Sequence, residues 1–306
     1  MKYSTEKFKG VFVALNSIYD SEDKINTKAT KELIKKYREI GINGIYACGS
    51  TGEGFLLSAD ERKRLCECVI EAADGKMAVI VHVGSASTKE SVELALHAKS
   101  AGADAVSAVP SVYYRLPEKS IALHWNTITE KADMPFIIYN IPQLTGYDLS
   151  YSLFNEMLKN ECVIGIKNSS DSVCQIERFA KLGGEDFVVF NGPDEQLLAG
   201  RMLGAKAGIG GTYGTMPELF VHLNRLFEKG DIENARLWQT RINDCIFDLL
   251  SCPSLYGGCK AVISRRFGID AGVPRLPFLS LDKNSEKAVK IAEKIDALAE
   301  LARSEC

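Results

Sequence analysis

Short apolar runs rich in β-branched residues recur along this chain, and each is followed by a segment with helical periodicity. Eight runs of this kind are present: Gly10–Leu15, Gly44–Ala47, Ala78–His82, Ala105–Val109, Phe136–Tyr139, Val163–Lys167, Phe187–Phe190 and Ala207–Gly210. Their nearly continuous apolar character is expected where both faces of a strand are buried in a parallel sheet. Eight β–α units in unbroken order within 306 residues favour an α/β fold of the closed (β/α)8 TIM barrel type over an open doubly wound sheet.

Local signals mark the beginnings and ends of several intervening helices. Ser58–Glu61 and Ser87–Glu90 have the spacing of a capping box, in which serine and glutamate side chains bind free N–H groups of the first turn. Gly41, Gly102 and Gly204 stand where helices are expected to end. The intervals between the apolar runs are therefore predicted to be helices.

The chain after the eighth run is too long for one more helix. Three stretches there show helical periodicity: Pro217–Lys229, Asp231–Leu250 and Ser285–Ala302. Proline and glycine interrupt the region between Cys252 and Pro277. We therefore predict a barrel over residues 1–230 and a C-terminal helical extension over residues 231–306 that covers one side of it.

Composition narrows the possible partners. Hydrophobic residues make up 46% and charged residues 25%, and the formal net charge is −3, which gives no general attraction to nucleic acid or anionic membranes. No apolar run approaches the roughly 20 residues that span a bilayer, and the polar start Met1–Lys9 lacks the apolar core of a secretory signal. Nine scattered cysteines match no zinc pattern and suggest reduced thiols. We expect a cytoplasmic protein that binds neither nucleic acid nor membrane and holds no metal.

Lys167 is the most informative strand-end residue. Barrel chemistry lies at the carboxyl ends of the strands, and Lys167 closes the otherwise apolar run Val163–Lys167. A lysine in this place is usually a solvated tip. In a poorly hydrated barrel mouth, however, burial lowers the pKa of an ammonium, and a neutral amine can attack a ketone to form an imine. No other strand end carries a lysine, cysteine or paired histidines suited to covalent or metal chemistry.

Two neighbouring strand ends fit this chemistry. Tyr139 ends the preceding strand and should lie beside Lys167, where a phenol can relay protons; the alternative is a tyrosine packed on the core. The loop Gly49–Glu53 offers backbone N–H groups and the hydroxyls of Ser50 and Thr51. Such a loop suits a carboxylate or a phosphate.

Two adjacent acids, Asp194 and Glu195, follow Asn191-Gly-Pro193 at the start of a predicted helix. Their simplest role is to cap that helix, because carboxylates favour a helix N-terminus. At a barrel mouth they could also accept hydrogen bonds from substrate hydroxyls. They suit a polyhydroxylated tail and are poorly suited to a phosphate.

Several other conspicuous residues have plain structural explanations. His82 lies inside an apolar strand and is expected to be a core histidine rather than a base. Cys48 has no activating neighbour in the sequence and is expected to pack. Trp125 and Trp238 are expected in the core or at subunit contacts, and the pair Arg265–Arg266 is too short to indicate nucleic-acid binding.

Three motifs together resemble the dihydrodipicolinate synthase/N-acetylneuraminate lyase family of pyruvate-dependent aldolases. They are Gly49–Glu53 (GSTGE), Tyr139–Pro142 (YNIP) and Gly165–Lys167 (GIK), in the family's order and spacing. The resemblance runs from Gly10 to about Thr212 and is looser in the C-terminal helices. It implies a class I aldolase that forms a Schiff base with a pyruvate-derived 2-keto acid. It also implies no metal or organic cofactor and a homotetramer built as a dimer of dimers.

The resemblance also assigns roles at matching positions. Lys167 would be the Schiff-base lysine, and Tyr139 the proton shuttle. Ser50 and Thr51, with their backbone amides, would hold the keto-acid carboxylate, and Thr51 would help to orient Tyr139. Tyr113 falls where the family has a tyrosine that reaches into a neighbouring subunit's site.

Leu144 bears on the choice of subgroup. Dihydrodipicolinate synthases usually carry an arginine at this position, two residues after the proline of Tyr-Asn-x-Pro, to bind a second substrate carboxylate. A leucine cannot make that charge-assisted contact. The lyase subgroup resembles this chain in having a leucine there.

The expected tail-binding residues point to the same subgroup. Gly192, Asp194 and Glu195 match positions that contact the hydroxylated tail of sialic acid in the lyases. Ser169 supplies a hydroxyl where lyases often have threonine. Gly211 departs from the pattern, because the lyases have serine there.

The leading interpretation is therefore an N-acetylneuraminate lyase, which cleaves sialic acid to N-acetylmannosamine and pyruvate. An aldolase for another 2-keto-3-deoxy sugar acid is the nearest alternative, suggested by Lys167-Asn-Ser-Ser170. Dihydrodipicolinate synthase is a further one. Outside these, the chain could be a non-catalytic barrel that binds pyruvate as a regulator, or a phosphate-handling isomerase, which Gly208–Gly211 suggests.

Overall fold

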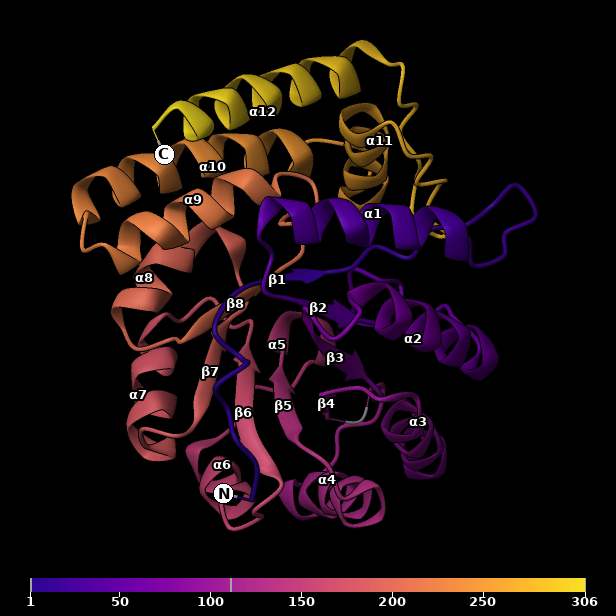
Figure 1. The fold of residues 1–306 in the computed structure, drawn as a ribbon. Coiled ribbons are helices and arrows are strands. Elements are labelled where there is room, and N and C mark those ends of the chain that lie inside the picture. Colours follow the sequence, from indigo (N-terminus) through magenta and orange to yellow (C-terminus); the bar gives the residue numbers. More distant parts are fainter. Residues whose placement is uncertain (1, 111, 306) are drawn as a thin grey trace.

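The computed structural model describes residues 2–110 and 112–305 and closes eight parallel strands into a barrel (Figure 1). The strands are β1 (Gly10–Ala14), β2 (Gly44–Ala47), β3 (Ala78–His82), β4 (Ala105–Ala108), β5 (Phe136–Asn140), β6 (Val163–Asn168), β7 (Val188–Asn191) and β8 (Ala207–Gly210). Each pairs with the next, and β8 returns to pair with β1. The predicted fold is confirmed, and every predicted strand agrees with the observed one to within one residue at each end.

Helices surround the barrel and fill the intervals between its strands. In chain order they are α1 (Thr27–Ile40), α2 (Ala59–Ala73), α3 (Thr88–Ala101), α4 (Glu118–Ala132), α5 (Pro142–Thr145), α6 (Tyr151–Met157), α7 (Cys174–Gly183), the 3₁₀ turn η1 (Asp194–Gln196), α8 (Leu197–Met202) and α9 (Pro217–Glu228). Helix α9 packs against β1 and α1 and so completes the outer ring.

One of the two predicted capping boxes is complete. The Ser58 hydroxyl accepts from Glu61 N–H and the Glu61 carboxylate accepts from Ser58 N–H. Ser87 also caps its helix by accepting from Glu90 N–H. The Glu90 carboxylate, however, accepts from the Ser85 hydroxyl at 3.0 Å, so the second box is only half formed. The Ser85 hydroxyl, which precedes the helix, binds the Glu90 carboxylate in place of the Ser87 N–H.

The strands separate two apolar layers. Alternate side chains point into the barrel, where Phe12 and Phe190 meet edge to face with ring centroids 5.5 Å apart. Their neighbours, such as Val13 and Val189, point outward into the layer beneath the helices. Both strand faces are therefore buried, which explains why the strands read as continuous apolar runs.

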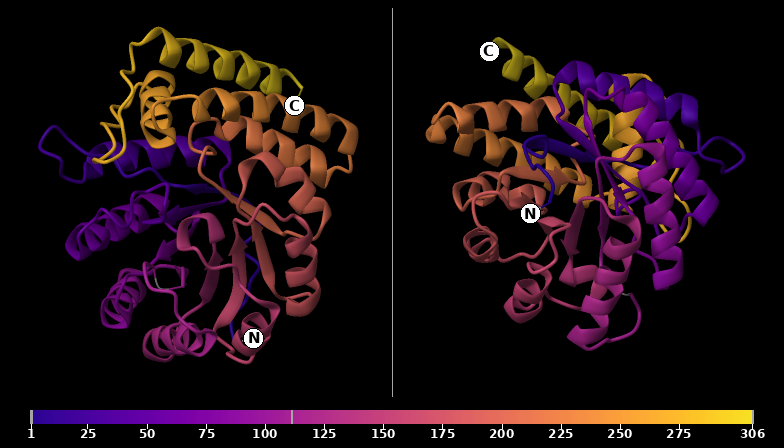
Figure 2. Two further views of the ribbon diagram at one scale, coloured as in Figure 1. Left: turned by 180° about the vertical axis from the view of Figure 1, so that it is seen from behind. Right: turned by 60° about the horizontal axis from the view of Figure 1, so that its bottom comes forward.

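Three further helices, α10 (Ile232–Leu250), α11 (Leu255–Phe267) and α12 (Glu286–Ser304), lie on one side of the barrel. The orange and yellow segments in Figure 2 stay together in both views. Helix α11 was missed by the sequence analysis, which took the glycines there as interruptions. Gly257 is instead required by close packing, because a Cβ there would lie 2.2 Å from the Leu279 carbonyl oxygen. The division at residue 230 remains a prediction.

The cysteines, possible metal clusters and possible membrane spans can be located in the described structure. The eight cysteines within the described residues are free, and Cys48 is buried, with burial raising the pKa of its thiol to about 11; Cys306 lies outside those residues. Among the described side chains, no cluster of three or more His, Cys, Asp or Glu residues could hold a metal ion. No helix in the described part of the chain has the length and apolar character needed to cross a membrane.

Candidate active site

Lys167 and Tyr139 lie side by side at the carboxyl ends of β6 and β5. The two residues are partners in the β5–β6 register, and Lys167 Nζ donates to the Tyr139 hydroxyl at 3.0 Å. Lys167 is only 5% exposed, and its Nζ lies 4.1 Å from the centroid of the Tyr139 ring and 4.9 Å from that of Tyr46. No carboxylate among the described residues comes within ion-pair distance, 4.0 Å, of this amine. An amine held among aromatic rings beside a phenol is well suited to attack a carbonyl.

The rings of Tyr46 and His82 pack edge to face against the Tyr139 ring, with centroids 5.7 and 5.9 Å from it. The Tyr46 hydroxyl donates to Ser107 Oγ at 3.0 Å, and burial raises the pKa of this phenol well above its usual value. Burial likewise lowers the pKa of His82 far below its ordinary range. Val109 N–H donates to His82 Nε2 at 3.3 Å, so Nδ1 carries the proton and donates to the Cys48 carbonyl at 3.2 Å. His82 is thus a neutral, hydrogen-bonded core histidine, as predicted.

The loop Gly49–Glu53 enters the mouth next to Tyr139. The Ser50 hydroxyl lies 3.5 Å from the Tyr139 hydroxyl, whereas no such contact joins Thr51 to Tyr139 within the described residues. Among the described residues, the hydroxyl of this loop that contacts Tyr139 is therefore that of Ser50, and the orienting role expected for Thr51 stays a prediction. Ser17 Oγ donates to the Gly52 carbonyl at 2.6 Å and fixes the loop from β1's side.

Asp194 is buried and binds the loop after β8 instead of capping its own helix. Its carboxylate accepts from Gly211 N–H at 3.1 Å and from the Thr212 N–H and hydroxyl, both at 2.6 Å. Burial raises the pKa of Asp194 to about 6, and the Thr212 hydrogen bonds offset part of that rise. Glu195, by contrast, is exposed. Capping explains neither side chain in the described structure.

The glycines on this side of the mouth leave room for close contacts. A Cβ at Gly192 would lie 2.0 Å from Ser169 Oγ, so the backbone approaches β6 as closely as only glycine permits. A Cβ at Gly211 would lie 3.0 Å from Thr51 Oγ. Thr51 therefore faces Gly211 across the mouth, and a side chain at position 211 would compete with its hydroxyl for space.

Tyr113 and Leu144 stand apart from this cluster. Tyr113 is 92% exposed and has a positive φ of 75°, and its one ring contact among the described residues is edge to face with the neighbouring Tyr114. Leu144 on α5 is 62% exposed. Neither side chain contacts Lys167 or Tyr139 through a hydrogen bond or ring contact within the described residues.

Tyr256 on α11 is a mouth residue that the sequence analysis missed. Burial raises its pKa to about 12, with smaller contributions from Tyr139, Cys259 and Glu53. Its ring packs edge to face against Phe278, with centroids 4.6 Å apart. The strand-end rule could not find it, because it comes from the extension.

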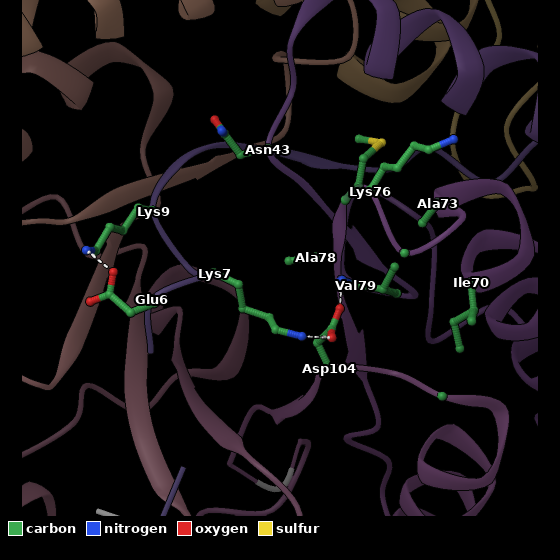
Figure 3. Close-up of a pocket in the computed structure, with 13 residues that line it drawn as sticks. Glu6, Lys7, Lys9, Asn43, Ile70, Ala73, Lys76, Ala78, Val79 and Asp104 are labelled. Carbon is green, nitrogen blue, oxygen red and sulfur yellow. Dashed lines mark hydrogen bonds and ion pairs between the residues drawn. The ribbon is translucent and has the colours of Figure 1, made fainter. Parts of the chain in front are cut away.

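A cavity of about 400 Å³ lies at the amino ends of the strands (Figure 3). Its charged side chains are already paired: Lys9 with Glu6 at 2.8 Å, Lys7 with Asp104, and Lys76 with Asp74 at 2.6 Å. Asp104 also accepts from Val79 N–H at 2.7 Å. The cavity is at the end of the barrel opposite to Lys167, and its charged side chains already have ion-pair partners, so the mouth is the better candidate.

Known proteins share both this sequence and this fold. The model of the Dihydrodipicolinate synthetase family matches residues 7–295. The chain is 41% identical to an N-acetylneuraminate lyase of Mediterraneibacter gnavus, over 95% of this chain and 93% of that one, and 37% identical to one of Clostridium perfringens, over 94% and 99%. A solved structure of a catalytic lysine mutant of Ruminococcus gnavus sialic acid aldolase superposes with a TM-score of 0.93, at 39% identity over 100% and 99% of the two chains. The chain therefore belongs to the dihydrodipicolinate synthetase family.

Proposed function

We propose that this protein is an N-acetylneuraminate lyase, a class I aldolase that cleaves sialic acid to N-acetylmannosamine and pyruvate. The observation that carries the proposal is the buried Lys167 amine, 3.0 Å from the Tyr139 hydroxyl at the barrel mouth. The near full-length similarity to N-acetylneuraminate lyases supports the same substrate.

The reaction begins at Lys167. Its neutral amine attacks the C2 ketone of open-chain sialic acid, and the ketone oxygen leaves as water with a proton from the Tyr139 hydroxyl, which gives a protonated imine and the Tyr139 phenolate. Tyr139 takes the proton of the C4 hydroxyl as the C3–C4 bond breaks and the electron pair flows into the imine. N-acetylmannosamine then leaves. Tyr139 passes that proton to the carbon of the remaining enamine. Water then hydrolyses the imine to release pyruvate and the Lys167 amine, and the proton set free restores the Tyr139 hydroxyl.

The loop Gly49–Glu53 binds the keto-acid carboxylate in this proposal. Ser50 and Thr51 supply hydroxyls, and the backbone amides of the loop supply further donors. Because Ser50 also lies 3.5 Å from the Tyr139 hydroxyl, it can couple carboxylate binding to the orientation of the proton shuttle.

The sugar tail would bind on the side of β7 and β8. Asp194 Oδ1 accepts one hydrogen bond in the described structure, from Gly211 N–H, and can accept another from a substrate hydroxyl. Glu195 and Ser169 offer further polar groups at the rim. Gly192 has no side chain that would block the path of the tail. Gly211 gives extra width there.

The assembly we infer is a homotetramer in the cytoplasm. The exposed ring of Tyr113, held at a strained φ of 75°, would then insert into the site of a neighbouring subunit. Exposed large aromatic side chains of this kind are typical of interface residues. Equilibrium sedimentation would test the subunit number, and Tyr113→Ala should lower activity if the ring completes the partner site.

Borohydride reduction in the presence of pyruvate tests the central proposal. The reductant should fix pyruvate covalently to Lys167, and peptide mass mapping should locate the adduct on that residue. A panel of N-acetylneuraminate, 2-keto-3-deoxygluconate, and pyruvate with aspartate semialdehyde should give turnover chiefly with the first. Trapping without turnover of any of them would favour a pyruvate-binding regulator.

A further inference from the structure

The loop after β2 is held in a costly backbone conformation. Cys48 and Glu53, near its two ends, have positive φ angles of 59° and 54°. Residues with side chains adopt such angles only where the surroundings impose them. The contacts of Glu53 therefore identify what holds the loop.

Glu53 is held by the C-terminal extension. Lys260 of α11 places its Nζ 2.6 Å from Glu53 Oε1, and Arg275 N–H, 222 positions along the chain, donates to Glu53 Oε2 at 2.7 Å. The side chains of Lys260 and Glu53 are 1% and 0% exposed. A buried charge pair of this kind is stable only while both partners are present.

The Lys260 ammonium is enclosed on other sides too. It donates to the Val273 carbonyl at 3.0 Å and lies 4.2 Å from the centroid of the Tyr19 ring. Burial lowers the pKa of Lys260 to about 8, although Glu53 raises it in part. The groups that retain this cation are thus Glu53, a backbone carbonyl and an aromatic face.

Arg275 fastens the far side of the same loop. Its guanidinium donates to the Leu56 carbonyl at 3.1 Å and to Glu61 Oε2 at 3.0 Å. The Arg275 hydrogen bond lowers the pKa of Glu61 to about 2. Glu61 also completes the capping box of α2, so the extension holds both the loop and the helix that follows it.

Ser50 connects these contacts to the chemistry. It lies between Cys48 and Glu53, and its hydroxyl is 3.5 Å from the Tyr139 hydroxyl. We propose that Glu53, Lys260 and Arg275 form a loop clamp, in which the buried Lys260–Glu53 ion pair positions Ser50 and the loop amides to bind the keto-acid carboxylate. This inference rests on the proposed aldolase function. Lys260 and Glu53 act in it as positioning residues.

A double variant separates positioning from simple stabilisation. Lys260→Met and Glu53→Gln should each lower the melting temperature, because each leaves a buried group without its charged partner. The double variant should recover much of that loss, since no lone charge remains. The pyruvate concentration for half-maximal borohydride trapping should nevertheless stay about tenfold above the wild-type value in the double variant, while the trapping rate at saturation changes little, the pattern of lost ground-state binding.

Trp238→Phe is the matched control in the extension. Trp238 is buried in α10, and its indole N–H donates to Glu305 Oε2 at 2.9 Å, with no part in the loop. This variant should lower the melting temperature and leave pyruvate half-saturation at the wild-type value.

Two results are decisive against the clamp. A double variant that regains wild-type half-saturation along with its stability would overturn it, as would a folded Glu53→Gln variant with wild-type half-saturation. If borohydride fails to trap pyruvate on Lys167 of the wild-type protein, the proposed aldolase function is contradicted. The proposed role of the clamp in carboxylate binding would then be contradicted as well.

Discussion

The two sides of the barrel mouth are built by different means. On one side, Lys167 and Tyr139 end adjacent strands, and the β5–β6 ladder sets their spacing. On the other, the loop Gly49–Glu53 depends on Lys260 and Arg275 from the extension. In the proposed function, the covalent chemistry thus belongs to residues on strands, whereas recognition of the carboxylate belongs to a loop held by contacts distant in the chain. Variants on the strand side and on the loop side of the mouth should therefore have different effects.

The largest effect is expected at the strand side, from Lys167→Arg. A guanidinium stays protonated at any working pH and cannot form the imine, so kcat should fall by at least about four orders of magnitude. Borohydride trapping should disappear, while calorimetric titration should still detect binding of pyruvate. Normal turnover by this variant would remove Lys167 from the mechanism.

Tyr139→Phe should have the next largest effect. It removes the phenol hydroxyl that accepts from Lys167 at 3.0 Å but retains the ring that packs in the barrel, so kcat should fall by about 10²- to 10⁴-fold. The melting temperature should change little. Steady-state kinetics and thermal unfolding measured on one preparation would check both statements, and an unchanged kcat would rule out the shuttle role.

Asp194 predicts a pH dependence on the recognition side. Its pKa is raised to about 6, chiefly by burial, so it takes up a proton as the pH falls through that value. Since both carboxylate oxygens accept backbone N–H bonds, a proton on either one weakens the hold on the β8 loop. KM for N-acetylneuraminate should therefore rise several-fold, about one order of magnitude at most, between pH 7 and pH 5.

Two variants sharpen this pH test. Asp194→Asn should show a raised KM that no longer responds to pH in this range. Glu195→Gln alters an exposed carboxylate and should keep the dependence near pH 6. A pH step that survives in Asp194→Asn would assign it to another group.

The smallest effect should come from Lys294→Met, in the extension but away from the mouth. Lys294 pairs with Asp248 at 2.6 Å, and both side chains are about half exposed. Loss of such a surface pair should cost less than about 1 kcal/mol of unfolding free energy and leave kcat and KM unchanged. A kinetic effect here would mean that the whole extension, rather than the clamp alone, controls the mouth.

Strand-end reasoning predicted the part of the site that follows from strand order. Consecutive parallel strands are neighbours in a (β/α)8 barrel, so Tyr139 had to lie next to Lys167 once both were placed at strand ends. The same rule gave the position of the loop Gly49–Glu53. It could not distinguish Ser50 from Thr51 as the partner of Tyr139, because that depends on which way each side chain turns.

Other parts of the site depend on contacts between residues far apart in the chain. The partners of Asp194 are Gly211 and Thr212, and the adjacent helix start in the sequence suggested capping instead. Tyr256 was hidden because its helix, α11, begins with glycines that usually interrupt helices. Those glycines are required by close packing, which no local pattern reveals.

The sequence by itself determined the eight-stranded barrel and the position of the Lys167 amine at its mouth, because hydrophobic periodicity and strand order are properties of neighbouring residues. Only the tertiary structure decided that Glu53 faces Lys260 and that Asp194 grips the β8 loop. Charged side chains pair according to distance in space and to the burial they share. Neither quantity can be read from the separation of the partners along the chain.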